Sequence, residues 1–311
     1  MLKTILSKIP RSIMTVLLII ALIAGIILTG CSQNTEPKED KTAQNTEKNT
    51  TQKSLLVYAG SASKPPTEEA AKLFEQKTGV KVDLVFGGSG TVLSQMKLNK
   101  KGDLYFPGSS DFMEKAKQEG LVYPETEAKI VYLVNAINVQ KGNPKGIKEL
   151  KDLLQPGLKV AIANPETVCV GLYATEIIDN NFTPEEKQAF KKNLINYTES
   201  CDKTATAISL KTVDAVIGWR VFQYWDPEKI ETIPLRKDQI ARIGYIPIAI
   251  SAFTQNKELS QQFIDFLNSE EGKASFKKYN YFVTPEEAEA YIGVDKPVGG
   301  EYKLQEDWIK K

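Results

Sequence analysis

Histidine is missing from this chain of 311 residues. It is the usual general base of Ser-His-Asp and Cys-His catalysis and a common metal ligand, so those active sites and histidine-based metal sites are excluded. Cysteine is scarce as well: the chain has only Cys31, Cys169 and Cys201, and none of them forms a Cys-x-x-Cys pair. We therefore expect no enzyme, no metal site and no cofactor. An extracellular thiol-based redox enzyme is the alternative from a different class.

A large net charge of either sign is also lacking. The chain has 40 Lys and Arg against 39 Asp and Glu, a net charge of +1. Lys3, Lys8 and Arg11 belong to the first thirty residues, and without them 37 basic side chains face 39 acidic ones, a net charge of −2. Nucleic-acid binding therefore has no electrostatic support. Any anion that the protein binds must be held by local donors.

The first thirty residues have the composition of an export signal. Their three basic side chains precede an almost wholly apolar run from Ile13 to Leu28. The run ends in Leu28-Thr29-Gly30-Cys31, which resembles the bacterial lipobox. This resemblance implies that residues 1–30 are a lipoprotein signal peptide, with cleavage before Cys31 and a lipid on its sulfur. The alternative is a retained anchor helix. Both place the protein outside the cytoplasm and attached to the membrane.

Residues 31–53 are polar and have no apolar pattern, so we predict a disordered tether. From Ser54 onward, predicted strands and helices alternate, which favours an α/β fold. An apolar, β-rich run over 130–139 is a candidate crossing between two lobes.

Three strand-turn-helix units follow one another at the start of this body, with turns near 59–63, 87–91 and 107–111. The first N–H groups of a helix have no intrahelical partner, and the helix dipole is positive at that end, so such turns bind anions. Ser61, Ser63 and Ser89 add hydroxyl donors. Ser61 and Ser63 could instead only cap a helix, and the 87–91 stretch could be a tight turn without a ligand.

Five segments carry a family resemblance. They are Ala59-Gly60-Ser61-Ala62-Ser63 with Pro65, Gly88-Ser89-Gly90-Thr91, Gly102 to Asp111, Glu166-Thr167-Val168 with Gly171-Leu172-Tyr173-Ala174, and Phe263 to Tyr279. With them, the body from about Leu55 to Tyr281 resembles the periplasmic-type substrate-binding proteins of ABC importers. It is most similar to their molybdate- and tungstate-binding branch.

The resemblance implies a two-lobed clamshell of the type II periplasmic-binding class with a two-stranded hinge. Lobe 1 would comprise residues 54–132 and 245–311, and lobe 2 residues 133–244. The protein would capture molybdate or tungstate between the lobes, deliver it to an ABC permease and work as a monomer. Phosphate, sulfate or a small organic acid is the alternative ligand on the same scaffold, and a sensor role stays open.

The resemblance also implies a set of ligand donors. Ser61 and Ser89 would come from lobe 1, and backbone groups near Val170 and Cys201 from lobe 2, while Trp219 stands where the molybdate proteins have tyrosine. A tetrahedral dianion has only acceptor oxygens, and all of these groups can donate. Trp219 could also be plain core.

The chain departs from the molybdate pattern at several positions. Ala62 stands where those proteins have their first serine, so Ser61 follows the tungstate pattern. Arg220, one of four arginines in the chain, follows Trp219 directly. It could clamp a phosphate-like or carboxylate ligand through bidentate bonds, or form a surface ion pair. Lys64 has the same two alternatives.

Cys169 replaces a proline of the molybdate proteins, and Cys201 occupies a position that is usually apolar there. The resemblance implies that the two lie on neighbouring turns of lobe 2, where a disulfide is the expected state outside the cytoplasm. They are 32 positions apart, and closing that loop would add roughly 3–4 kcal/mol of stability. Two free buried thiols are the alternative, and a soft-metal or arsenic-like ligand is a further one.

Overall fold

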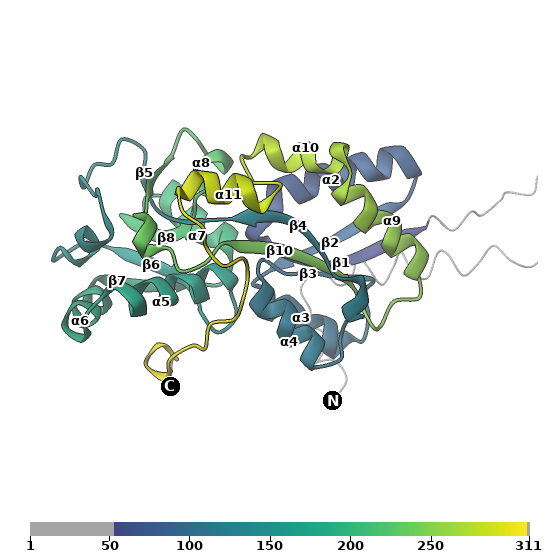
Figure 1. Cartoon of the computed structure of the whole chain (residues 1–311), viewed down its shortest axis with the longest axis horizontal. Helices are drawn as coiled ribbons and strands as arrows, with labels where there is room; N and C mark the ends of the chain where they lie inside the picture. The colour runs from purple at the N-terminus through teal and green to yellow at the C-terminus, as the bar shows by residue number, and fades with distance from the viewer. Residues whose placement is uncertain (1–52, 310–311) are drawn as a thin grey trace, which may run out of the picture. The chain divides into compact units, whose positions relative to one another are not determined.

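The computed structural model describes residues 53–309 (Figure 1). The predicted signal peptide, Cys31 and nearly all of the predicted tether lie outside the described residues. Within them are two five-stranded sheets. The first has the order β2-β1-β3-β10-β4, with β1 Ser54–Gly60, β2 Lys81–Gly87, β3 Leu104–Phe106, β4 Ala128–Leu133 and β10 Gly244–Ile250. The second has the order β7-β6-β8-β5-β9, with β5 Asn135–Gln140, β6 Val160–Ala163, β7 Leu194–Thr198, β8 Ala215–Trp219 and β9 Ile230–Pro234.

Helices pack against both sheets (Figure 1). The α-helices are α2 Lys64–Thr78, α3 Ser89–Asn99, α4 Ser110–Gln118, α5 Cys169–Asn181, α6 Pro184–Asn193, α7 Cys201–Ser209, α8 Phe222–Trp225, α9 Lys257–Asn268, α10 Glu270–Lys278 and α11 Pro285–Ile292. The 3-10 turns are η2 Ser61–Ser63, η3 Pro124–Thr126, η4 Leu150–Leu154, η5 Lys237–Gln239 and η6 Glu306–Trp308. Local chemistry sets the helix limits: α2 has proline in its first turn, where no N–H is needed, and Gly79 ends it in the left-handed conformation at φ 71°.

Parallel pairing brings the predicted turns together. β1 lies between β2 and β3 and runs parallel to both, with Gly60 opposite Gly87 and Ala59 opposite Phe106. In the second sheet, β6 runs parallel to β7 and β8. Turns that follow parallel strands gather at the carboxyl edge of a sheet, which is where α/β proteins bind ligands. The turns after β1, β2 and β3 therefore lie side by side.

The chain crosses between the two sheets twice. The predicted crossing at 130–139 is interrupted at Val134, so that β4 belongs to the first sheet and β5 to the second. The second crossing, at residues 235–243, joins β9 to β10. Two sheets with helices and two crossings between them confirm the predicted two-lobed α/β fold. The exact limits of the lobes stay a prediction.

The C-terminal segment, which the predicted limits assign to lobe 1, contacts helices of the second sheet. Its Trp308 ring packs against Phe190 of α6, and its indole N–H donates to Asp179 of α5 at 3.0 Å. Lys191 of α6 donates to the Asp307 carboxylate at 2.8 Å. The last described residues therefore contact the helices of the second sheet, because a large buried ring needs the apolar surface that those helices offer.

One continuous apolar cluster joins the two sheets. It includes Val57 and Phe106 of the first sheet, Val216 and Trp219 of the second, and Val168 from the turn before α5. The two lobes are therefore packed against each other.

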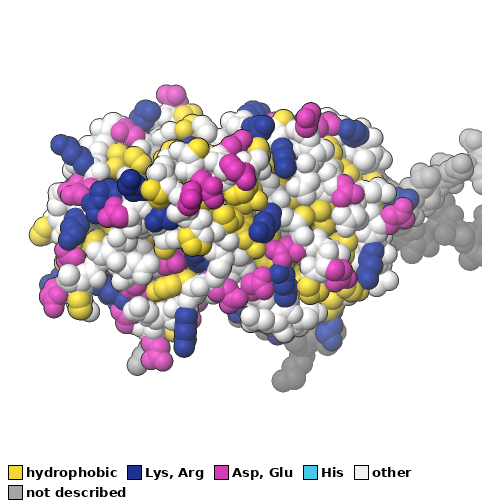
Figure 2. All heavy atoms as spheres, in the orientation of Figure 1, with side chains coloured by type: hydrophobic (Ala, Val, Ile, Leu, Met, Phe, Trp, Pro, Cys, Tyr) yellow, Lys and Arg dark blue, Asp and Glu magenta, His cyan; other side chains and the backbone are white. Residues whose placement is uncertain are grey.

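Figure 2 shows acidic and basic side chains interspersed over the visible face, in agreement with the net charge near zero.

Candidate functional site

The site is built around the turns that follow β1, β2 and β3. Gly60, at the end of β1, has no room for a side chain, since a Cβ there would lie 2.7 Å from both Gly108 N and Ser89 Oγ. The Gly108 N–H donates to Ser89 Oγ at 3.0 Å. The three predicted turns are thus in direct contact, and the glycines are needed because the backbones approach so closely.

Two turns of the second lobe face them. The Gly90 N–H of α3 donates across the lobes to the Thr167 carbonyl at 2.8 Å. The Asp202 N–H, in the first turn of α7, donates to Ser61 Oγ at 3.3 Å. The predicted first-lobe residues Ser61 and Ser89 are therefore both buried at the junction of the lobes.

The serine hydroxyls differ in how they are used. Ser89 Oγ accepts a hydrogen bond from the Gly108 N–H, and no described residue accepts a hydrogen bond from the Ser89 hydroxyl. Ser61 Oγ accepts from the Asp202 N–H and lies beside the Asp202 carboxylate. Ser63 Oγ instead shares a 3.0 Å hydrogen bond with Thr67 Oγ1 inside α2. The predicted ligand contact by Ser63 therefore has no support, and Ser63 makes no side-chain cap bond either.

The second lobe contributes two helix starts. Helix α5 begins at Cys169 and α7 at Cys201, so the backbone N–H groups of Val170 and Cys201 lie in first turns, where helices have no partners of their own. The sulfurs of Cys169 and Cys201 are 3.6 Å apart, and both cysteines are free and buried. The predicted neighbourhood of the two cysteines is thus found, but the structure has two thiols in place of the predicted disulfide.

Thiol sulfur reaches the point where the lobes meet. A Cβ on Gly108 would lie 2.4 Å from Cys169 Sγ, so this sulfur packs directly on the first-lobe turn. Burial raises the pKa of the Cys201 thiol well above its ordinary value, and the neighbouring Cys169 raises it further. Hydrogen bonds from the Val170 N–H and the Trp219 indole N–H lower the pKa of the Cys201 thiol. Both groups therefore lie close to the Cys201 sulfur.

Trp219 is fully buried at the end of β8, where its ring packs edge-on against Tyr173 with 5.0 Å between the ring centroids. Among the described residues, Trp219 Nε1, Tyr173 Oη and Ser109 Oγ are buried polar atoms without a hydrogen-bond partner. Such groups are costly unless something satisfies them. Tyr173 and Ser109 were not predicted as site residues, because nothing in their sequence neighbourhood reveals an unpaired atom.

The Arg220 side chain is buried against aromatic rings. Its guanidinium lies 4.2 Å from the centroid of the Phe282 ring, and its NH1 and NH2 groups donate to Asn280. Burial lowers the pKa of Arg220. The predicted surface ion pair is corrected, because the side chain is buried against aromatic rings. Its two terminal nitrogens have acceptors and its Nε has no partner among the described residues, and the anion clamp stays a prediction.

An arginine that sequence reasoning missed joins the lobes. Arg242 lies in the second crossing and donates to both carboxylate oxygens of Asp111 in α4, at 2.9 and 3.2 Å. Its Nε donates to Glu176 of α5 at 2.8 Å, and its guanidinium covers the Tyr173 ring. All three ionised side chains are nearly buried. No local motif marks Arg242, since its partners come from distant helices.

A cavity of about 480 Å³ opens beside the serine turns. Its lining includes Gly88 and Lys64 from the first lobe and Thr167, Asp202 and Lys203 from the second. Burial raises the pKa of Asp202, but hydrogen bonds from Ser200 and Ser61 and the charge of Lys64 outweigh it and hold the pKa below its usual value. An ionised Asp202 and Lys64, 3.9 Å apart, therefore stand at the mouth of the site, which gives Lys64 the ion-pair role.

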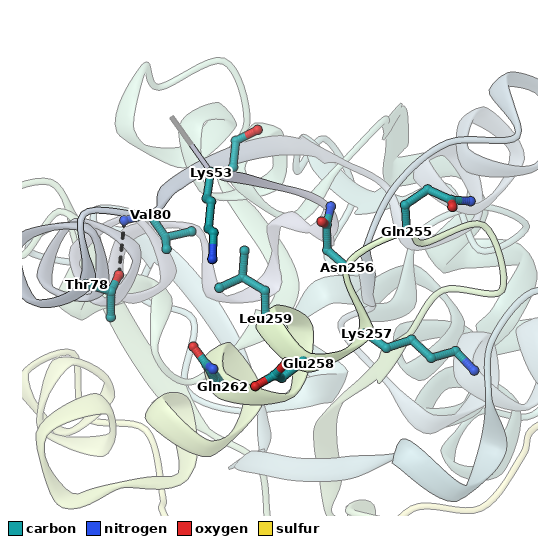
Figure 3. A pocket seen from close by; sticks show the side chains of 10 residues that line it. Lys53, Thr78, Val80, Gln255, Asn256, Lys257, Glu258, Leu259 and Gln262 are labelled. Carbon is teal, nitrogen blue, oxygen red and sulfur yellow. Dashed lines mark hydrogen bonds between the residues drawn. The ribbon is translucent and has the colours of Figure 1, made fainter. Parts of the chain in front are cut away.

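A larger cavity lies elsewhere among the described residues. It measures about 740 Å³ and is lined by residues that include Lys53, Val80 and Asn256 (Figure 3). It lies at the amino ends of β1 and β2, opposite the edge that carries the serine turns. We therefore place the candidate site between the lobes.

Comparison with known proteins agrees with this placement. A family described as "Bacterial extracellular solute-binding protein" matches residues 55–281. A Haemophilus influenzae protein, provisionally named a binding protein, is 28% identical over 228 residues, 71% of this chain and 88% of that protein. The molybdate-binding protein ModA of Rhodobacter capsulatus is 24% identical over 221 residues, 70% of this chain and 83% of ModA.

A solved structure shows the same fold. The sulfate-binding protein SubI of Mycobacterium tuberculosis superposes with a TM-score of 0.66 at 16% identity, over 79% of this chain and 94% of SubI. Between residues 53 and 309, no helix is long and apolar enough to cross a membrane. The same range contains no group of three or more Cys, Asp or Glu side chains arranged to hold a metal ion.

Proposed function

Because the chain belongs to the bacterial extracellular solute-binding proteins of ABC importers, we propose that it captures molybdate or tungstate between its lobes and delivers the anion to a permease. The observation that carries this proposal is the Ser89 hydroxyl. It accepts a hydrogen bond from the Gly108 N–H at the junction of the lobes. No described residue accepts a hydrogen bond from the Ser89 hydroxyl in return. An acceptor-only dianion is the natural partner for such a donor.

The surrounding donors support a small oxyanion. The first-turn N–H groups of α5 and α7 and the Trp219 indole N–H approach this junction, where Ser61 also lies with its hydroxyl bonded to Asp202. All of them are neutral, so an empty site traps no unpaired charge. A ligand held by both lobes stabilises the closed form, which a permease can recognise.

Sulfate is the second candidate, because it is also a tetrahedral dianion without protons and SubI shares the fold. Thermal unfolding of the full chain in detergent, with and without molybdate, tungstate, sulfate, phosphate and arsenate, decides between the ligands. A ligand at a hundred times its Kd should add about 2.7 kcal/mol, a Tm shift of a few degrees. A shift with sulfate alone would replace molybdate by sulfate, and no shift with any oxyanion would reject the proposal.

Replacing Ser89 with alanine should weaken oxyanion binding about tenfold to a hundredfold, because a hydrogen bond to a charged group contributes about 1.5–3 kcal/mol. Titration calorimetry measures the change. Ser94→Ala is the matched control, because Ser94 lies on the same helix and donates to its own helix at Gly90 O. Equal affinities of the two variants would remove Ser89 from the site.

Asp202 should discriminate protonated from unprotonated anions. Its carboxylate, ionised at neutral pH, repels a fully ionised dianion but can accept a hydrogen bond from the P–OH group of hydrogen phosphate. Asp202→Asn should therefore strengthen or leave unchanged the binding of molybdate and sulfate, and weaken that of phosphate. Calorimetric titration of the three anions at neutral pH checks this, and weaker molybdate binding would contradict it.

We further propose that Cys31 carries the lipid anchor and that the protein works as a monomer outside the cytoplasm. The export-type N-terminus supports this proposal. Fractionation tests the anchor: Cys31→Ser should prevent lipid attachment, and a lipid label that persists in the variant would contradict it. Size-exclusion chromatography with light scattering tests the monomer.

A further inference from the structure

The proposed anion site contains a feature that oxyanion binding does not use. Cys169 and Cys201 begin two different helices, and their sulfurs lie 3.6 Å apart at the junction of the lobes. Both side chains are free and about 1% exposed. Two thiols are thus held side by side by two separate helix starts.

A buried donor that the oxyanion would also use lies next to this pair. The Trp219 indole N–H lies close to the Cys201 sulfur, and Tyr173 packs on the Trp219 ring. Trp219 Nε1 and Tyr173 Oη have no hydrogen-bond partner among the described residues. The thiols therefore lie beside one buried donor, the Trp219 N–H, to which an oxygen atom could bind.

The separation of the sulfurs restricts what they could bind together. With bonds of about 2.3 Å, as in zinc–thiolate sites, sulfurs 3.6 Å apart subtend an angle of about 100° at a shared central atom. A linear two-coordinate ion would need sulfurs about 4.6 Å apart with the same bond length. The geometry thus matches a pyramidal or tetrahedral centre and does not match a linear one.

A tetrahedral zinc ion needs further charged or imidazole ligands. The chain has no histidine, and the described residues contain no cluster of three metal-binding side chains. A trivalent pyramidal centre needs only the two thiols, because it can keep one oxygen of its own. That remaining hydroxyl would be the partner of the Trp219 N–H.

We propose that Cys169 and Cys201 form a dithiol site for a trivalent, thiophilic oxyacid of the arsenite class. Arsenous acid, As(OH)₃, is neutral and can enter the cleft, past the ion pair of Asp202 and Lys64, while the lobes are open. Two As–O bonds break and two As–S bonds form, and the two thiol protons leave with the two hydroxyls as water. The product keeps one As–OH group, and no electron transfer is involved.

This inference goes beyond the proposed function, since it concerns a different ligand in the same cleft. Occupation by one ligand excludes the other. Cys169 Sγ already fills the space against Gly108, so the central atom sits among the donors that an oxyanion would use.

Intact-mass spectrometry with sodium arsenite tests the site. The full chain is purified in detergent with Cys31→Ser, reduced with a phosphine and freed of excess reagents. We expect one arsenic per chain, and none in Cys169→Ser or Cys201→Ser. Ser94→Ala, which keeps both thiols and changes a residue outside the site, should still retain arsenic. Absence of retained arsenic in the parent, or equal retention in either cysteine variant, would overturn the inference.

Arsenic X-ray absorption on the loaded parent gives a readout that does not depend on how well the variants fold. Two sulfur neighbours and one oxygen neighbour are expected, and a shell of three oxygens would reject the site. Molybdate binding is measured separately on the same preparation. Arsenic retention without molybdate binding would reject only the proposed function, and the reverse result would reject only the dithiol site.

Discussion

Replacing Arg242 with methionine should lower the free energy of unfolding by about 3–5 kcal/mol. The guanidinium is nearly buried and is the ionic partner of both Asp111 and Glu176, so its removal leaves two carboxylates without their cation. Burial already raises the pKa of Glu176 against the opposing charge of Arg242. Urea unfolding followed by far-UV circular dichroism measures the loss.

Arg236→Met is the matched control for this experiment. Arg236 also pairs with two carboxylates, those of Glu149 and Asp238, but its side chain is 53% exposed. Solvent screens such pairs, so this variant should keep nearly the parent midpoint. Adding Asp111→Asn and Glu176→Gln to Arg242→Met should recover much of the loss, because the uncompensated charges are gone. An unchanged midpoint in Arg242→Met would show that the network does not hold the lobes.

Replacing Gly88 with alanine should weaken ligand binding about fivefold to a hundredfold and barely change the stability of the unliganded protein. A Cβ on Gly88 would lie 2.8 Å from Thr167 O, 2.9 Å from Glu199 O and 2.9 Å from a methyl of Val168. All three atoms belong to the second lobe. Overpacking of this kind costs about 1–3 kcal/mol, and the cost falls on the closed form, since open lobes relieve the contact.

Gly87→Ala tests whether the effect comes from closure. The nearest atom to a Cβ on Gly87 is a Val92 methyl of the same lobe, at 3.1 Å. This neighbouring substitution should therefore leave ligand affinity nearly unchanged. Calorimetry gives the affinities, and thermal unfolding without ligand gives the stabilities. Equal affinity in Gly88→Ala and the parent would mean that the ligand does not require these turns to meet.

Local sequence patterns predicted the parts of the site that depend on neighbouring residues. The small residues after β1 and β2 correctly predicted two turns. Ser61 and Ser89 in these turns lie where the lobes meet. The run at 130–139 was correctly interpreted as a crossing, although the break at Val134 was not visible. Strands β7 and β9 were missed, because the polar residues Asn196, Glu231 and Thr232 interrupt their apolar pattern at the sheet edges.

Interactions between distant residues could not be predicted in this way. Arg220 follows a candidate site residue, yet its guanidinium packs on Phe282 and binds Asn280, some sixty positions away. Arg242 carries no motif, and its importance comes from Asp111 and Glu176 on two different helices. In both cases the partners are distant in sequence. They reach the arginine only because the crossings between the sheets and the C-terminal segment fold back against the sheets.

By itself, the sequence determined the class of the protein: an α/β body, no histidine chemistry and neutral donors at glycine-rich turns. These features depend on composition and on spacing within a few residues, where backbone conformation and helix ends are decided locally. Only the tertiary structure decided that two thiols lie 3.6 Å apart, that Trp219 keeps an unpaired N–H and that Arg242 joins the lobes. Those properties depend on distances between residues far apart in the chain, which arise when the two sheets close on each other.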